Sequence, residues 1–443
     1  MVIKKHVRLT SVRLISGGFL LVIIVGTLLL MLPFASRGSG SASFMDALFT
    51  ATSAICVTGL VVQDTSTYWT AFGHAVILTL IQIGGMGVIT MAIMVARFSG
   101  RKIGLMQRST MQEAIAAPQV GGIVKLTNFI IKTTVIVELS GAVLMAPVFI
   151  PEFGVARGIW YAIFHSISAF CNAGFDLMGV RGQYSSLTGF NGDPVINIVI
   201  MLLIVIGGIG FICWDDIVHK GIHIKKYHLQ TKMILTITPF LIFIPAVFFY
   251  FHEFEFIQGP TRVWVSLFQS VTTRTAGFNT VDLRGLSSTS VFIMIILMII
   301  GGSTGSTAGG MKNTTFFVLI ISSISVFRRH DDTTCFGRRI SDKIVKNAST
   351  LLMLYLVLFL TGGVTISALE GLPILDCLFE TASAIGTVGL TLGITPSLGT
   401  ISHLILIILM FVGRVGGLTL IFSASSAAHK SLSRYPQEQV NVG

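Results

Sequence analysis

The sequence predicts an all-α integral membrane protein built from four pseudo-fourfold repeats, each a helix, a short re-entrant helix and a second helix. Composition is the first observation: of 443 residues, 53% are hydrophobic and 11% are charged, whereas soluble domains carry about 25% charged residues. The second observation is a motif that occurs four times. The third is that each copy of this motif lies between two long apolar runs.

Each motif is a short helical pattern that starts at a phenylalanine and ends in a turn with a glycine. The four copies read FTATSAICVTGL, FHSISAFCNAGF, FQSVTTRTAGF and FETASAIGTVGLTLG. Their glycines are Gly59, Gly174, Gly277 and Gly389, spaced 115, 103 and 112 residues apart. A period near 110 residues indicates an internal repeat. The third copy has one residue fewer between its phenylalanine and its glycine, so we expect the upper part of the four-turn assembly to depart from fourfold symmetry.

We divide the chain into repeats at residues 1–100, 101–220, 221–335 and 336–443. The eight outer runs are about 20 residues or longer, enough to cross roughly 30 Å of hydrocarbon. They are 14–34 and 73–96, 127–150 and 194–214, 232–251 and 291–327, and 347–369 and 401–423. The middle helices, expected within 44–60, 159–175, 263–278 and 375–390, are too short to span.

Four units of this kind in one chain predict a central pore with pseudo-fourfold symmetry. Irregular backbone at membrane depth is tolerated only where protein buries it or where it lines a water-filled path. Glycine permits positive φ angles, which a turn with all its carbonyls directed inward requires. Rings of carbonyls can then replace the hydration shell of a monovalent cation, and helix C-termini aimed at the axis add partial negative charge.

Basic residues indicate the orientation. Of 30 Lys and Arg residues, 23 fall in segments on one side, at 1–13, 97–132, 220–232, 312–346 and 430–434. The other side has five, and two more (Arg274 and Arg414) lie inside the repeats. Positive charge accumulates in cytoplasmic loops, so we expect both termini in the cytosol and the re-entrant turns to open outward. This distribution argues against nucleic acid as a partner and for the lipid membrane.

Backbone oxygens in the four turns are the candidate ligands, because the side chains differ between repeats. The alternative is that these are only tight structural turns at helix ends. The candidates are Cys56, Val57, Thr58 and Gly59; Cys171, Asn172, Ala173 and Gly174; Arg274, Thr275, Ala276 and Gly277; and Gly386, Thr387, Val388 and Gly389.

The second helix of the third repeat is interrupted by a run of small and polar residues. The run is Gly301, Gly302, Ser303, Thr304, Gly305, Ser306, Thr307, Ala308, Gly309, Gly310, Met311, Lys312 and Asn313. Five glycines and five hydroxyl or amide side chains in 13 residues do not make a stable lipid-facing helix, so we expect a loop beneath the turns. A phosphate-binding loop is disfavoured because it needs G-K-[ST] after a strand. A flexible linker is the remaining alternative.

Two arginines stand at membrane depth, where a charge is costly and is a functional candidate. Arg414 lies in the middle of a spanning run, and its alternative role is a salt bridge to Glu138, Glu380 or Asp376. We expect Arg274 to support the third turn by donating to carbonyls or acids. Glu138 itself is interpreted as a helix-packing hydrogen-bond partner.

Enzymatic and metal-binding arrangements are poorly supported. The five cysteines are scattered without metal-ligand spacing. His165, His252 and His403 also lack such spacing and are expected at membrane boundaries. There is no Ser/His/Asp arrangement and no paired-carboxylate site in an aqueous domain, so we expect no enzyme and no metal beyond a transported cation.

With these motifs in place, the chain resembles the ion-translocating subunit of the Trk/Ktr/HKT superfamily of potassium transporters over nearly its whole length. The quartet VTGL, NAGF, TAGF and TVGL carries the resemblance. Four such turns in register between spanning runs are a specific signal, although one alone is weak. Eight spanning runs and a short N-terminus resemble the bacterial KtrB type more than the TrkH type, which has two extra N-terminal helices.

The resemblance implies potassium uptake through a selectivity filter, either passive or promoted by sodium. It also implies a homodimer in the bacterial plasma membrane and a cytosolic ring of RCK-type regulatory subunits, similar to KtrA, which alone bind nucleotide. It makes residues 301–313 the intramembrane gating loop and Arg414 an electrostatic barrier. Glycine at position 59, where sodium-selective members have serine, favours potassium. Sodium or mixed monovalent cation transport, and a membrane scaffold without transport, remain the alternatives.

Overall fold

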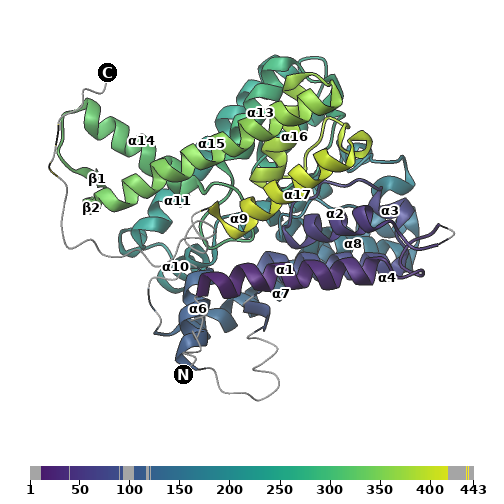
Figure 1. Cartoon of the computed structure of the whole chain (residues 1–443), viewed down its shortest axis with the longest axis horizontal. Helices are drawn as coiled ribbons and strands as arrows, with labels where there is room; N and C mark the ends of the chain where they lie inside the picture. The colour runs from purple at the N-terminus through teal and green to yellow at the C-terminus, as the bar shows by residue number, and fades with distance from the viewer. Residues whose placement is uncertain are drawn as a thin grey trace, which may run out of the picture.

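Helices make up nearly all the secondary structure of the protein, as the computed structural model shows (Figure 1). The structure describes residues 11–38, 40–88, 90–92, 104–115, 119, 121–417, 436 and 438. The basic segments 1–10 and 430–434, and part of the segment 97–108, lie outside the described residues. The predicted all-α membrane class is confirmed. The repeat boundaries remain a prediction, with which the order of helices agrees.

The first helix of each repeat is long and apolar, as predicted. Among the described residues, four helices are long and apolar enough to cross a membrane alone, given that a span needs about 20 residues. They are α1 (Ser11–Leu30), α7 (Ile123–Phe153), α11 (Leu229–Phe248), which continues as the π-helical turn η4 (Phe249–Glu253), and α15 (Asp342–Glu370).

The re-entrant helices form at the predicted places. They are α2 (Phe44–Ile55), α8 (Val155–Phe170), α12 (Pro260–Thr272) and α16 (Ile374–Gly386). Each has between 12 and 16 residues, which at about 1.5 Å per residue is shorter than the hydrocarbon layer. Each ends a few residues before its motif glycine, so its C-terminus is directed at the turn.

The second helices differ from the prediction of continuous spans, because each is interrupted at a glycine with positive φ. In chain order these glycines are Gly87, Gly210, Gly301 and Gly416, with φ between 67° and 98°. The helices before them are α4 (Ala71–Met86), α9 (Pro194–Gly208), α13 (Ser288–Ile300) and α17 (Thr400–Val415). After Gly210 the chain resumes as α10 (Phe211–Lys220) at 97° to α9. Only the third interruption was predicted; the left-handed backbone at the others ends the helix regardless of hydropathy.

The four repeats pack in a closed circle. Each first helix contacts the re-entrant helix of its own repeat. Each second helix contacts the re-entrant helix of the next repeat: α4 with α8, α9 with α12, α13 with α16. The contact of α17 with α2 closes the circle. This arrangement brings the C-termini of the re-entrant helices to one place, as the pseudo-fourfold interpretation requires.

Glycines allow the second helices to approach the re-entrant helices at backbone distance. A Cβ atom at Gly207 would lie 2.0 Å from the carbonyl oxygen of Phe170, the last residue of α8. The equivalent distance is 2.1 Å for Gly84 against Ile55 of α2, and 2.1 Å for Gly413 against the α16 backbone. No side chain fits in these contacts.

The remaining elements lie at the two ends of the helical assembly. Helix α14 (Asn313–Phe327) leads to a hairpin of β1 (Thr333–Cys335) and antiparallel β2 (Arg338–Ile340), which precede α15 (Figure 1). The shorter elements are α3 (Thr65–Tyr68), α6 (Leu105–Ile115), η1 (Met178–Val180), η2 (Thr188–Phe190), η3 (Ile224–Lys226), η5 (Leu283–Gly285) and η6 (Thr395–Ser397).

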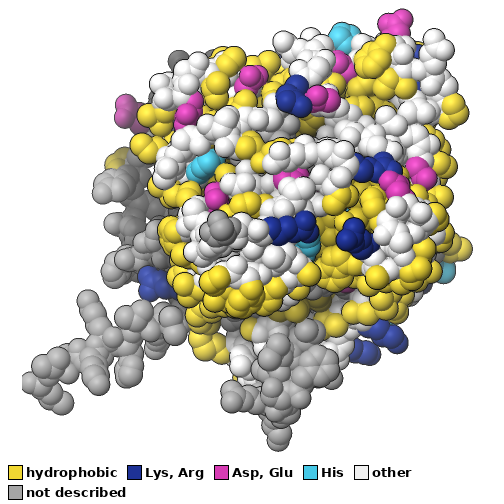
Figure 2. Space-filling view, turned by 90° about the vertical axis from the view of Figure 1, so that its right-hand side faces the viewer, with side chains coloured by type: hydrophobic (Ala, Val, Ile, Leu, Met, Phe, Trp, Pro, Cys, Tyr) yellow, Lys and Arg dark blue, Asp and Glu magenta, His cyan; other side chains and the backbone are white. Residues whose placement is uncertain are grey.

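The face at the right of Figure 1, where α1 ends and α3 lies, is the expected outer side. Figure 2 shows basic and acidic side chains scattered over this face, with hydrophobic side chains prominent at its margins. Mixed charge is normal for a water-exposed surface, and the apolar margin suits the edge of a bilayer.

The backbone-distance contact at Gly207 gives the first testable prediction. Gly207→Ala should lower the free energy of unfolding by about 1–3 kcal/mol and make the protein less resistant to heating. The added methyl group meets a backbone oxygen that cannot move without shifting α8. The measurement is the fraction of detergent-solubilised protein that stays monodisperse after heating. Gly17→Ala is the control, since a Cβ there meets nothing within 4 Å. If the two variants kept the same monodisperse fraction after heating, this packing would be contradicted.

Candidate functional site

The four motif glycines meet in a ring at the centre of the circle. A Cβ at Gly59 would lie 2.5 Å from the carbonyl oxygen of the residue before the second glycine, and the same relation holds at 2.7, 2.4 and 2.1 Å around the ring. The four oxygens approached in this way belong to Ala173, Ala276, Val388 and Thr58. Only glycine fits at these positions. All 16 candidate residues therefore lie in four turns that converge on one place.

Positive φ angles recur within each turn. The ring glycines have φ between 69° and 97°. The residue two positions earlier is also left-handed in every repeat: Val57, Asn172, Thr275 and Thr387, with φ between 49° and 66°. Three of these four are β-branched, for which such an angle is a genuine outlier and costs about 1–3 kcal/mol. Strain of this kind persists only where the surrounding structure imposes it, and it clusters at functional sites.

A hydroxyl residue on each re-entrant helix holds its turn. In the first and fourth repeats, Ser53 and Ser383 Oγ accept from the N–H groups of Gly59 and Gly389 at 3.1 and 3.0 Å. In the second and third repeats the hydroxyl instead donates to the carbonyl of the phenylalanine after the ring glycine. These bonds are Ser168 to Phe175 at 2.7 Å and Thr272 to Phe278 at 2.5 Å. The hydroxyls fasten each turn to its own helix.

The residue missing from the third motif is absorbed below the ring. Thr58, Ala173 and Val388 each donate their N–H to the carbonyl five residues earlier, whereas Ala276 donates to Thr272, four residues earlier. The ring contacts above are nevertheless complete. The departure from fourfold symmetry therefore falls between helix and turn, and the expectation that it affects the upper part of the assembly is corrected.

A buried polar residue directly after the motif phenylalanine anchors the segment beyond the ring. Glu380 accepts from Thr391 Oγ1 at 2.6 Å and from Thr395 Oγ1 at 2.5 Å. His165 Nε2 accepts from the N–H of Leu177 at 3.3 Å. In the third repeat, Gln269 Nε2 donates to Thr280 Oγ1 at 3.3 Å. These side chains hold the outer mouth of the ring.

Two acidic residues lie in the outer segments beside the ring. Asp64 joins the first two repeats, because its carboxylate accepts from Thr67 N at 2.9 Å and from Tyr184 N at 2.8 Å. Asp176 follows Gly174 by two residues and accepts from Met178 N at 2.9 Å. Burial, and to a smaller extent the charge of Asp64, raises the pKa of Asp176 to about 7.

Residues 301–312 form a loop directly beneath the ring, and Asn313, the last residue of the predicted loop, begins α14. The N–H groups of Ser303 and Thr307 donate to the carbonyls of Gly208 and Gly207 at 3.0 and 3.2 Å. On the opposite side, a Cβ at Gly309 would lie 2.0 Å from Thr387 Oγ1 of the fourth turn. The loop thus passes from the second repeat to the fourth, across the inner end of the ring.

Arg414 links this loop to the first repeat. Its guanidinium donates to the carbonyl oxygens of Thr307 in the loop and of Gly84 and Gly85 at the end of α4. Within the described chain it has no acidic partner. The salt-bridge alternative for Arg414 is therefore wrong, because its guanidinium bonds backbone carbonyls instead.

A cavity of about 260 Å³ lies on the inner side of the loop. Thr304, Lys312 and Arg414 line it together with residues of α1, α6 and α10. Lys312 Nζ donates to the carbonyl of Ala308 at 2.7 Å, so its amino group is turned back onto the loop. The cavity is therefore lined by the loop and by two basic side chains.

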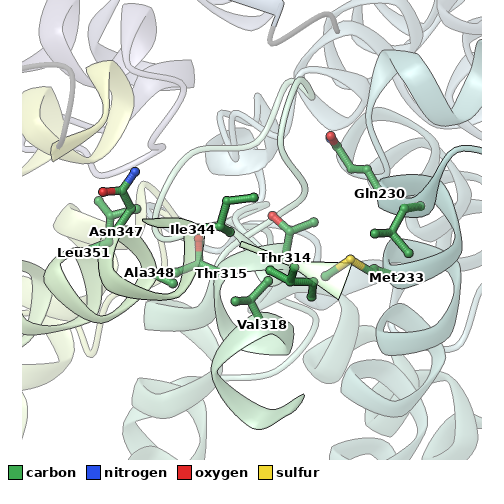
Figure 3. A pocket seen from close by; sticks show the side chains of 11 residues that line it. Gln230, Met233, Thr314, Thr315, Val318, Ile344, Asn347, Ala348 and Leu351 are labelled. Carbon is green, nitrogen blue, oxygen red and sulfur yellow. The ribbon is translucent and has the colours of Figure 1, made fainter. Parts of the chain in front are cut away.

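A second pocket of about 400 Å³ adjoins the far end of the loop, between α11, α14 and α15 (Figure 3). Its lining is mostly apolar, and Gln230, Thr314 and Asn347 supply polar atoms. Thr314 Oγ1 lies 2.8 Å from Thr304 Oγ1, and Gln230 Nε2 lies 3.5 Å from the Thr304 carbonyl. Movement of α14 relative to α11 would therefore act on the loop.

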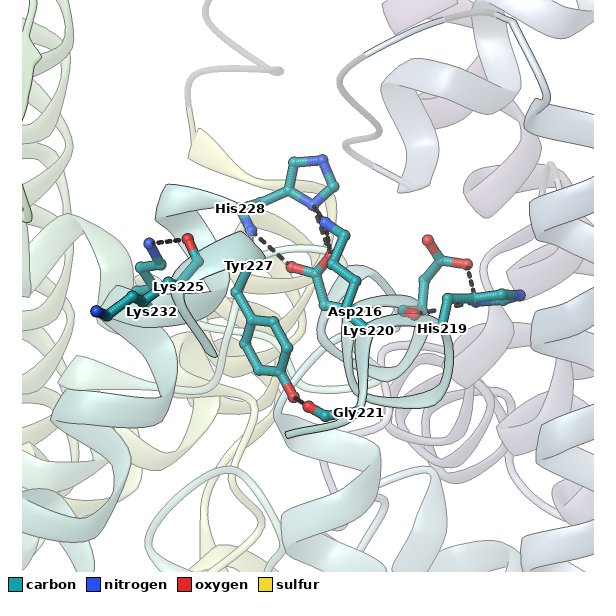
Figure 4. A network of polar contacts seen from close by, with 9 residues as sticks. Asp216, His219, Lys220, Gly221, Lys225, Tyr227, His228 and Lys232 are labelled. Carbon is teal, nitrogen blue, oxygen red and sulfur yellow. Dashed lines mark hydrogen bonds and ion pairs between the residues drawn. The ribbon is translucent and has the colours of Figure 1, made fainter. Parts of the chain in front are cut away.

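A polar network orders the basic turn between the second and third repeats (Figure 4). The buried carboxylate of Asp216 accepts from Lys220 Nζ at 2.5 Å and from the backbone N–H of His228 at 2.8 Å. Tyr227 donates to the carbonyl of Gly221 at 2.5 Å. The segment 220–232 is thus a shaped basic surface on the expected cytosolic side.

The other sequence interpretations fared differently. Glu138 of α7 accepts from Gln82 of α4 at 3.4 Å, which is the predicted packing bond. His165 and His403 are buried, and each bonds a backbone carbonyl within its repeat. Their predicted place at the membrane boundary stays a prediction. Arg274 is buried with no partner for Nε among the described residues, so its predicted support of the third turn stays a prediction.

Sequence reasoning missed the hydroxyls, the left-handed residues before the glycines and the three other helix interruptions. The hydroxyls had a visible signal, since Ser53, Ser168, Thr272 and Ser383 align in the four motifs. The interruptions had a weaker one, the repeated Ile-Gly-Gly at residues 83–85, 206–208 and 300–302. The left-handed residues share no side-chain chemistry, so the sequence held no signal for them.

A circle of membrane helices that closes around a ring of backbone turns defines a membrane transport protein rather than an enzyme. The profile of the TrkH family, described as cation transport protein, matches residues 15–233 and 227–433. The chain therefore belongs to the TrkH family of cation transport proteins.

Known relatives agree with this family. The chain is 40% identical over 455 residues to the potassium/sodium uptake protein NtpJ of Enterococcus hirae, covering 100% of both chains. It is 39% identical to the Ktr system potassium uptake protein B of Bacillus subtilis, covering 99% of this chain and 98% of that one. These relatives make it a KtrB-type membrane subunit. The potassium transporter TrkH of Vibrio parahaemolyticus shares the fold, with a TM-score of 0.72 at 21% identity over 95% of this chain and 86% of that one.

Proposed function

We propose that this protein is the membrane subunit of a bacterial potassium uptake system and that potassium passes through the ring of four turns. The observation that carries the proposal is the closed ring itself, with two left-handed residues in every turn. Left-handed and right-handed residues that alternate direct successive carbonyls to one side, and rings of carbonyls replace the hydration shell of a cation. The C-termini of four re-entrant helices add partial negative charge there.

The loop 301–313 is the gate in this proposal, and Arg414 holds it closed. The loop spans the inner end of the ring, and Arg414 binds it to the end of α4. At roughly 4 Å and an effective dielectric near 20, a unit charge acts on a passing cation with about 4 kcal/mol. An energy of this size slows permeation about a thousandfold. Water in the path would lower this interaction energy.

The regulatory partner is an RCK-type ring on the cytosolic side, similar to KtrA, that alone binds nucleotide. The protein itself acts as a homodimer in the plasma membrane, with both termini in the cytosol. The basic turn at 220–232 and the hairpin at 328–346 offer ordered surfaces for such a ring. Sodium is the second candidate ion, as promoter or as cargo, because one relative is named a potassium/sodium uptake protein.

Gly59 sets the preference for potassium in this proposal. Gly59→Ser should lower potassium flux and the ratio of potassium to sodium flux, because its Cβ meets the carbonyl of Ala173 at 2.5 Å. Cation flux into liposomes containing purified protein measures both quantities. Gly17→Ala again serves as the control. A parental ratio and rate in Gly59→Ser would remove Gly59 from the filter.

The gate predicts a gain of flux. A protein lacking much of 301–313 should carry potassium faster than the parent and depend less on the regulatory ring. Arg414→Ala should raise flux more modestly, by at most about a thousandfold, while keeping potassium preference. Liposome flux with and without the ring is the measurement. If the shortened protein folds as a dimer yet carries potassium no faster, this loop is not the gate.

The hairpin predicts where the ring docks. Arg338→Glu with Arg339→Glu should weaken co-purification of the ring without unfolding the membrane part, since Arg338 and Arg339 lie on the exposed strand β2. Arg339 already pairs with Asp332 at 2.8 Å, so Arg338→Glu alone tests charge without breaking that pair. Arg37→Glu, on the expected outer side, is the matched control. Full retention of the ring would mean that these charges only orient the chain.

A further inference from the structure

Asn172 is the one residue of the four turns whose side chain bonds both a neighbouring turn and the loop. It occupies the left-handed position of the second turn, with φ 58° and 1% exposure. Asparagine tolerates this backbone better than most residues. Its counterparts Val57, Thr275 and Thr387 carry no amide, so this chemistry occurs in one quadrant of the ring only.

The contacts of Asn172 fix the orientation of its amide. Nδ2 lies 3.3 Å from the carbonyl of Arg274 and 3.4 Å from Thr275 Oγ1, both in the third turn. A carbonyl only accepts, so the NH₂ group must face Arg274. The amide oxygen is thereby turned to the loop, where Thr307 Oγ1 lies 3.2 Å away.

Thr307 is fully buried and connects this amide to the gate. Its hydroxyl also lies 3.1 Å from the carbonyl of Phe170, so one hydrogen is shared between two acceptors. Its N–H donates to Gly207, and its carbonyl accepts from Arg414. A displacement of the loop therefore cannot leave Asn172 undisturbed.

Room around the amide is limited. A Cβ at Gly207 would lie 3.0 Å from Asn172 Oδ1, and one at Gly208 would lie 3.4 Å from Nδ2. The side chain is wedged between the end of α9, the third turn and the loop. When the loop withdraws, the amide oxygen loses its donor, and the Arg274 carbonyl loses a fixed partner.

We propose that Asn172 couples the loop to the lower filter, so that the preference between potassium and sodium depends on the position of the loop. The inference rests on the proposed function and adds that gate and filter are one linked device. With the loop in place, the amide holds the Arg274 carbonyl at the base of the third turn. With the loop withdrawn, Asn172 Oδ1 and the Arg274 carbonyl are both free to contact a passing cation.

The test compares two single variants with their combination. Asn172→Gly removes the amide and keeps the left-handed backbone, and Thr307→Val removes the hydroxyl and keeps the shape. Each should change the potassium to sodium flux ratio in liposomes by about twofold to tenfold, the effect of one buried hydrogen bond. The double variant should change it no more than the larger single change. Thr307→Ser keeps the hydroxyl and should stay near the parent.

Three results with the substituted proteins would overturn the coupling, and one with the loop-deleted protein is given below. They are unchanged ratios in both single variants, additive changes in the double variant, and an equal effect of Asn172→Gly with and without the loop. Thr307→Val leaves the turns unaltered, so it answers the question even if Asn172→Gly fails to fold. If loop deletion leaves flux unchanged but the two residues are non-additive, the link stands and the gate fails. If deletion raises flux at a constant ratio, the gate stands and the link fails.

Discussion

The structure depends on bringing four stretches of backbone together without side chains between them. Each ring glycine faces the carbonyl of the next turn at a distance that excludes a Cβ. Turns this close need helices that approach equally closely, and glycines at the ends of α4, α9 and α17 permit it. Polar backbone inside a membrane must be satisfied by protein or line a wet path. The hydroxyls beneath the turns and the anchors beyond them bond backbone groups of the turns and of the outer segments.

Equivalent positions in the four repeats share a structural task and differ in chemistry. The residue after each motif phenylalanine is buried in all four repeats, yet it is threonine, histidine, glutamine and glutamate in turn. The position after the first glycine at the end of the second helix is glycine in three repeats and Arg414 in the fourth. Together with Asn172 and the loop, these differences give each repeat its own polar side chains. The backbone of the ring is repeated four times, and the side chains around it are not.

Much of the fold and the ring could be predicted from the sequence, because four copies of one motif in register are hard to explain otherwise. The loop beneath the ring was visible for a similar reason, since residues 301–313 break hydropathy as well as helix propensity. The interruptions at Gly87, Gly210 and Gly416 were not predicted, because a single glycine in an apolar run leaves hydropathy intact and is common in membrane helices. The partners of Arg414 could not be predicted at all. They are backbone carbonyls, which every residue has, so no residue type in the sequence marks them.

The strain in the turns explains why so much structure surrounds so few residues. Val57, Thr275 and Thr387 hold angles that their branched side chains disfavour, so the turns would not keep this shape alone. The closed circle, the buried hydroxyls and the outer anchors together impose this backbone conformation on the turns. A carbonyl ring held in this way has a fixed geometry, as the proposed filter requires.

The circle is made by one chain, and this has a consequence for how such a protein can change. In a ring assembled from four identical subunits, every substitution appears four times around the axis. Here each quadrant is encoded separately, so a single codon can place an amide, a carboxylate or a guanidinium on one side of the path while the other three stay as they were. A circle made by one chain can therefore be altered in one quadrant at a time.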